Sequence, residues 1–164
     1  MEIARQYTLL GQILPAERAM RDAVVLSGDD RFVVRSAARF YLHAGDLEMA
    51  HSVVSRSVLA RSDPWVMAAE LSVATATGRP PASVAAARRL IRSGHAPDEH
   101  LTELASALGT LELEAGASRA GRELLLRSIR RPNDNALAQA VWVSSRRGVP
   151  LSPLTSKITT TSEV

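Results

Sequence analysis

The sequence predicts an all-α protein made of antiparallel helix pairs that recur about every 34 residues. Its composition favours helices, since alanine is abundant and aromatic residues make up only 4% of the chain. The apolar fraction of 46% is enough to form a core. Glycine, aspartate and proline also recur where helices of such a repeat would begin and end.

The repeat is visible when residues 1–30 are aligned with residues 35–64, an offset of 34. Seven positions are then identical, whereas about two would agree by chance. The identical pairs are Ala4 and Ala38, Arg5 and Arg39, Tyr7 and Tyr41, Gly11 and Gly45, Ala16 and Ala50, Val24 and Val58, and Asp29 and Asp63.

A helix-turn-helix unit of this length resembles the tetratricopeptide repeat (TPR), and residues 31–64 are similar to one complete unit. The matching positions are Ala37-Ala38, Tyr41, the turn Gly45-Asp46, then Ala50, Val54 and Ser57, with Pro64 near the end. The resemblance implies a right-handed α-solenoid of about nine helices, in which small residues make room for bulky ones on the neighbouring helix.

The remaining units follow in order within a predicted repeat domain of residues 1–148. Unit 65–97 holds helices from Trp65 to Thr77 and from about Ala82 to Arg92, although the register of the second helix stays open. Unit 98–133 recovers the motif, and 134–147 is expected to be a capping helix before a flexible tail at 149–164. The motif positions of the fourth unit are Leu108-Gly109, Gly116, Gly121, Leu125 and Ser128.

Helix boundaries are predicted from local chemistry. A glycine in the left-handed conformation ends a helix at low cost, and an aspartate can cap the next one. Proline suits the first turn, where no amide hydrogen is needed. The expected glycines are Gly28, Gly45, Gly78 and Gly116, the expected caps Asp30, Asp46 and Asp63, and the expected prolines Pro15 and Pro64.

Composition also excludes several classes of protein. The chain has no cysteine, which excludes disulfides and thiolate metal sites. No apolar stretch reaches the length of a membrane span, and the first residues lack the layout of a signal peptide. We therefore expect a soluble cytoplasmic protein, and the abundance of alanine and arginine suggests a bacterial source.

In the TPR family the first helices of successive units line a concave groove, so the resemblance implies which residues would bind a partner. They are Arg5, Phe32, Arg35, Arg39, Leu42 and His43. The arginines could pair with carboxylates of an acidic peptide. The asparagine and lysine pattern of the family's carboxylate clamp is absent. The equivalent positions in the later units, Ala69, Val73, Ser106 and Thr110, would either form an apolar groove or be covered by another part of a longer protein.

The search for catalytic chemistry finds no phosphate loop and no nucleophile elbow. His95 and His100 lie near Asp98, Glu99 and Glu103, but acidic residues at a helix start favour the helix dipole. We expect no enzyme activity, no metal and no cofactor.

The predicted function is a protein–protein interaction module that holds a peptide or partner protein in the concave groove. It would be a scaffold on its own or the repeat part of a larger signalling, regulatory or defence protein. The alternative is a nucleic-acid-binding repeat protein that uses the arginine pairs Arg88-Arg89, Arg130-Arg131 and Arg146-Arg147.

Overall fold

The computed structural model describes residues 1–129, apart from the side chains of residues 98, 99 and 129. Within this range the chain forms eight α-helices and one short 3₁₀ helix, without any strand. The all-α prediction is confirmed. The expected capping helix 134–147 and the tail 149–164 lie outside the described residues.

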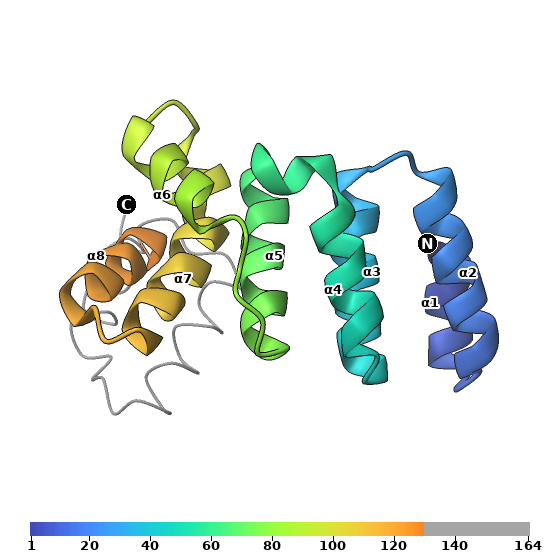
Figure 1. Ribbon diagram of the computed structural model, residues 1–164. Coiled ribbons are helices and arrows are strands. Elements are labelled where there is room, and N and C mark those ends of the chain that lie inside the picture. Colours follow the sequence, from blue (N-terminus) through green and yellow to red (C-terminus); the bar gives the residue numbers. More distant parts are fainter. Residues whose placement is uncertain (130–164) are drawn as a thin grey trace, which may run out of the picture. The chain divides into compact units, whose positions relative to one another are not determined.

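The described helices fall into two compact units, of which the first comprises Met1–Pro80. Its elements are α1 (Glu2–Leu9), α2 (Ile13–Leu26), α3 (Arg31–Ala44), α4 (Leu47–Arg56), the 3₁₀ helix η1 (Val58–Arg61) and α5 (Pro64–Ala76). Figure 1 shows α1 with α2 and α3 with α4 as two hairpins, and α5 packs on both α3 and α4.

The second unit begins at Pro81 and contains three described helices. They are α6 (Val84–Ser93), α7 (Asp98–Glu114) and α8 (Ser118–Ile129). Helix α7 packs against both α6 and α8. The helices expected from Trp65 to Thr77 and from Ala82 to Arg92 correspond to α5 and α6, displaced by one or two residues.

One turn geometry recurs after α1, α3, α5 and α7. Each of these helices ends at a glycine in the left-handed conformation, and the next residue donates its amide hydrogen to a carbonyl five residues earlier. In α3, for example, Asp46 N donates to Tyr41 O at 2.9 Å. This is the Schellman arrangement, which closes the last turn of a helix and starts a new direction. The four glycines are Gly11, Gly45, Gly78 and Gly116.

The predicted aspartate caps are present. The Asp30 carboxylate accepts from the amides of Phe32 and Val33, and Asp63 accepts in the same way from Trp65 and Val66. Asp46 caps α4 through Met49 N. Pro64 is the first residue of α5, where its missing amide hydrogen leaves no bond unmade.

The alanines paired by the 34-residue offset are buried alike. Ala4 and Ala38 are both completely or almost completely buried, as are Ala16 and Ala50, and the paired residues Met20 and Val54 are buried too. Tyr41 is buried, whereas its equivalent Tyr7 is half-buried. The difference follows from packing, since α3 contacts α2, α4 and α5, while α1 contacts chiefly α2.

In the second unit, glycine allows α7 and α8 to touch through their backbones. A Cβ atom on Gly121 would lie 2.6 Å from Leu113 Cγ and 2.9 Å from the carbonyl oxygen of Gly109. A Cβ on Gly109 would in turn lie 3.0 Å from the carbonyl oxygen of Gly121. The two glycines therefore form a close crossing that no other residue type fits without movement of the backbone.

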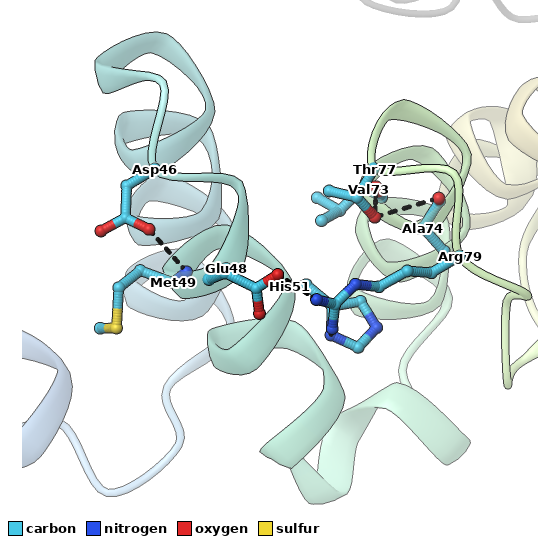
Figure 2. A network of polar contacts seen from close by, with 8 residues as sticks. All are labelled: Asp46, Glu48, Met49, His51, Val73, Ala74, Thr77 and Arg79. Carbon is cyan, nitrogen blue, oxygen red and sulfur yellow. Dashed lines mark hydrogen bonds and ion pairs between the residues drawn. The ribbon is translucent and has the colours of Figure 1, made fainter.

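Arg79 fastens the segment after α5 to helix α4. Its guanidinium donates to Nδ1 of His51 at 3.1 Å and forms an ion pair with Glu48 (Figure 2). The hydroxyl of Thr77 donates to the carbonyls of Val73 and Ala74, which are at the end of α5. The turn after α5 is thus held both by its own helix and by the neighbouring hairpin.

Tyr41 brings a polar atom into the core of the first unit. The residue is 2% exposed and its ring meets Phe40 edge-on at 5.2 Å. Its hydroxyl has no hydrogen-bond partner in the described part of the chain. Burial raises the pKa of Tyr41 above its ordinary value; the positive charge and hydrogen-bonding capacity of the nearby Arg21 oppose this rise, and Glu17 and Asp46 add to it.

We predict that Gly121→Ala destabilises the protein by about 1–3 kcal/mol, because overpacking outweighs the roughly 1 kcal/mol that alanine gains over glycine in a helix. Urea unfolding followed by circular dichroism measures the change. Arg122→Ala, an exposed neighbour on α8, is the control and should leave the midpoint nearly unchanged. A Gly121→Ala variant as stable as the wild type would mean that the backbones do not touch.

Tyr41→Phe should leave stability unchanged or raise it by up to about 1 kcal/mol at neutral pH, because it removes a buried hydroxyl without a partner. Since the folded-state pKa is raised, the unfolded chain loses its tyrosine proton first as the pH rises past about 10. The wild type should therefore lose more stability than the variant between about pH 8 and about pH 11. Unfolding of both proteins at the two pH values tests this; a constant difference would contradict it.

Candidate functional site

Aromatic and cationic side chains meet where α3 and α5 begin. The rings of Phe32 and Trp65 are 6.2 Å apart and tilted by 54°. The guanidinium groups of Arg31 and Arg35 both lie over the Trp65 ring, at 4.9 and 5.6 Å from its centroid. These four residues are called the aromatic–arginine cluster below. Cation–π contacts of this kind hold flat groups in a fixed arrangement at the surface.

Asp63 contacts the cluster through an ion pair with Arg31. Its carboxylate caps α5 through the amides of Trp65 and Val66, and its second oxygen lies 3.1 Å from the guanidinium of Arg31. The aspartate is 7% exposed, whereas the arginine side chain is 41% exposed. One buried carboxylate therefore fixes both the start of α5 and the position of an arginine on α3.

The structure brings two of the predicted site residues together, places three others further along α3, and places Arg5 on α1. Phe32 and Arg35 meet at Trp65, and Phe32 is 62% exposed. Arg39 and His43 are exposed one and two turns further along the same helix. Leu42 is half-buried and packs against the core, so it borders the exposed face of α3.

Arg5 stands apart from this group. It lies on α1, and its guanidinium is 3.7 Å from the carboxylate of Glu2, one turn earlier in the same helix. Both side chains are largely exposed. No hydrogen bond or ion pair among the described residues links Arg5 to α3.

The sequence prediction did not include Trp65 and Arg31 in the site. The 34-residue offset offered a signal, because Trp65 stands in the third unit where Arg31 stands in the second. Equivalent positions on successive first helices lie near each other when those helices pack, as α3 and α5 do. The offset could therefore have paired these two residues.

The later positions assigned to the groove are mostly covered. Val73, Ser106 and Thr110 are buried, and Ala69 is half-buried. Among the arginine pairs, Arg88 is engaged within the second unit, where its Nε donates to Glu112 at 2.8 Å. Arg130-Arg131 and Arg146-Arg147 lie outside the described residues.

Apart from Tyr41, the ionisable side chains of α3 are all basic. The helix carries three arginines and one histidine and no acidic residue between its first and last positions. Of these, Arg31 is paired with Asp63, while the side chain of Arg39 makes no hydrogen bond or ion pair in the described range 1–129. This face can therefore receive a carboxylate next to an exposed aromatic ring.

Within residues 1–129, no three histidine, aspartate or glutamate side chains are grouped closely enough to hold a metal ion. In the same range no helix has the length and apolar character needed to cross a membrane. No family model, curated protein or solved structure matches the chain.

Replacing Asp63 separates its two roles. Asp63→Asn can still cap α5 but loses the charge, and since Arg31 is partly exposed the expected loss is about 0.5–1 kcal/mol. Asp63→Ala loses the cap as well and should be destabilised by about 1–2 kcal/mol more. Thermal unfolding of both variants measures the two losses. Equal damage by asparagine and alanine would show that the cap contributes little.

Proposed function

We propose that the chain is a TPR-like repeat module whose helix pairs stack as a right-handed α-solenoid. Two findings support this. The same glycine turn follows α1, α3, α5 and α7, and the alanines paired by the 34-residue offset are buried in both of the first two helix pairs. Repeats of this kind bury a continuous core only by stacking on their neighbours, which leaves one side of the first helices available to a partner.

We further propose that the module binds an acidic peptide segment of another protein on the exposed face of α3 beside α5. The observation that carries this proposal is the aromatic–arginine cluster, in which an exposed phenylalanine is held against a tryptophan that two guanidinium groups cover. Aromatic residues and arginine are enriched at protein interfaces and dominate their binding energy.

The cluster suits such a ligand for two physical reasons. Phe32 offers apolar surface that stays in contact with water until a partner covers it. The cations along α3 supply the charge that a carboxylate needs; Arg31 is already paired with Asp63, whereas the Arg39 side chain makes no ion pair in the described range. The rings and guanidinium groups are held in place before binding, so little conformational entropy is lost when a partner arrives.

The test uses a labelled peptide library in which leucine or phenylalanine is flanked by glutamate, with binding followed by fluorescence anisotropy. The double variant Arg35→Glu/Arg39→Glu should lower the affinity for the best peptide by more than about tenfold, because the peptide's glutamates would then be repelled by the new glutamates on α3. Phe32→Ala should also weaken it, without a change of salt dependence. Arg89→Glu/Arg122→Glu makes the same charge change at exposed positions of the second unit and should leave affinity nearly unchanged.

Unchanged affinity in the α3 double variant would remove the proposed site. Equal weakening by the control pair would show that only the overall charge of the protein matters. In that case the exposed face of α3 would have no special role.

A further inference from the structure

A second surface lies on other helices of the first unit. A half-open cavity of about 490 Å³ separates α2 from α4, because α2 packs on the second hairpin chiefly through α3. Its walls come from four elements of the chain and combine aliphatic with polar side chains. The apolar lining residues are Val24, Val25, Val34, Met49, Val53 and Val58.

These walls leave apolar surface in water. Val25 is 76% exposed and Val58 is 73% exposed, although both line the cavity. Covering such surface is favourable by about 25 cal/mol per Å². The cavity therefore favours a ligand with an aliphatic part.

One polar atom of the lining is buried and lacks a partner. Tyr41 borders the cavity, and its hydroxyl donates to no acceptor among the described residues. The nearby Arg21 guanidinium can only donate hydrogen bonds, so it could not receive the phenolic proton. What this hydroxyl lacks is an acceptor.

Two cations line the same cavity. Arg21 and Arg56 are exposed; the Arg21 guanidinium interacts with the Tyr41 hydroxyl, and the Arg56 side chain makes no hydrogen bond or ion pair within residues 1–129. The acidic residue of the lining, Asp29, is already used, since its Oδ2 accepts from Val58 N at 2.9 Å. Apart from Asp29 and the serine hydroxyls, the polar groups of the lining are Arg21, Arg56 and Tyr41, and each of them can donate hydrogen bonds.

The bond from Val58 to Asp29 also shapes the cavity. Asp29 has a φ of +79°, a left-handed conformation that is rare for residues other than glycine and is best tolerated by asparagine and aspartate. Its carboxylate ties the turn between α2 and α3 to the residue that follows α4 by two positions. The cavity is thus closed at one end by a fixed contact and does not depend on a loose loop.

We propose that the cavity between α2 and α4 binds a small aliphatic carboxylate. The alkyl chain lies along the valines, and the carboxylate accepts hydrogen bonds from Arg21, Arg56 and the Tyr41 hydroxyl. A cavity of this volume, mostly apolar with a few donors, is within the size range of small-molecule sites. The site shares no residue with the aromatic–arginine cluster and stands independently of the proposed function.

The experiment is a titration of the full chain with decanoate, below its micelle concentration, followed by calorimetry and by NMR shifts of backbone amides. Decanol, decylamine and acetate are the comparison probes. We expect saturable binding of decanoate with shifts in α2 and α4, binding of decanol at least about tenfold weaker, and no binding of decylamine or acetate.

The double variant Arg21→Gln/Arg56→Gln should weaken decanoate binding by at least about tenfold. Arg18 is an exposed arginine of α2 outside the lining, so Arg18→Gln should leave decanoate binding unchanged. Tyr41→Phe should weaken decanoate while the protein stays folded, which separates loss of the hydroxyl from loss of structure. Circular dichroism confirms folding of each variant.

Three outcomes would overturn the proposal. The first is absence of decanoate binding, including the case in which only a peptide carrying leucine and glutamate binds the cavity. The second is equal affinity for decanoate, decanol and decylamine, which indicates unspecific adsorption. The third is decanoate affinity that neither the arginine double variant nor Tyr41→Phe changes.

Discussion

The close approach of neighbouring helices, made possible by alanine and glycine at their contact points, is the constraint on which the rest of the structure depends. In the first unit Ala16, Ala38 and Ala50 are completely or almost completely buried, and none of them has a side chain beyond Cβ. In the second unit the same role falls to Gly109 and Gly121, whose backbones meet directly. Where helices touch through such small residues, bulky neighbours such as Tyr41 and Leu125 can fill the remaining space.

This mode of packing also decides which surfaces remain available. In the first unit, core contacts use one stripe of α3, so the opposite stripe carries Phe32, Arg35, Arg39 and His43 without any part in the core. Helix α5 meets α3 near its first turn and adds Trp65. The second helices α2 and α4 lie further apart, and the space between them is lined by valines and donors. The packing of helices through small residues therefore leaves two surfaces of different chemistry, the exposed face of α3 and the cavity between α2 and α4.

Polar contacts between distant residues fasten this arrangement. Asp63 joins the cap of α5 to Arg31, Asp29 joins the turn after α2 to Val58, and Arg79 joins the turn after α5 to α4. Each contact uses a group that already stands at a helix end. The ends of the helices therefore serve both as turns and as points of attachment, which keeps the surfaces between them in fixed positions.

The sequence by itself determined the helical class, the turns and the caps. These depend on local chemistry, such as the left-handed backbone at Gly45 or the carboxylate of Asp30 near two amides, and such chemistry acts within a few residues. The 34-residue offset also identified which alanines would be buried, because equivalent positions in a repeat have the same surroundings.

Only the tertiary structure decided which side chains meet. The pairing of Arg31 and Arg35 with Trp65, the ion pair of Arg88 with Glu112 and the unpartnered hydroxyl of Tyr41 depend on the distance and rotation between helices. Those quantities arise from the packing of many side chains at once, so no local pattern contains them. The same reason explains why Val73, Ser106 and Thr110 are buried although the repeat pattern assigned them to a binding face.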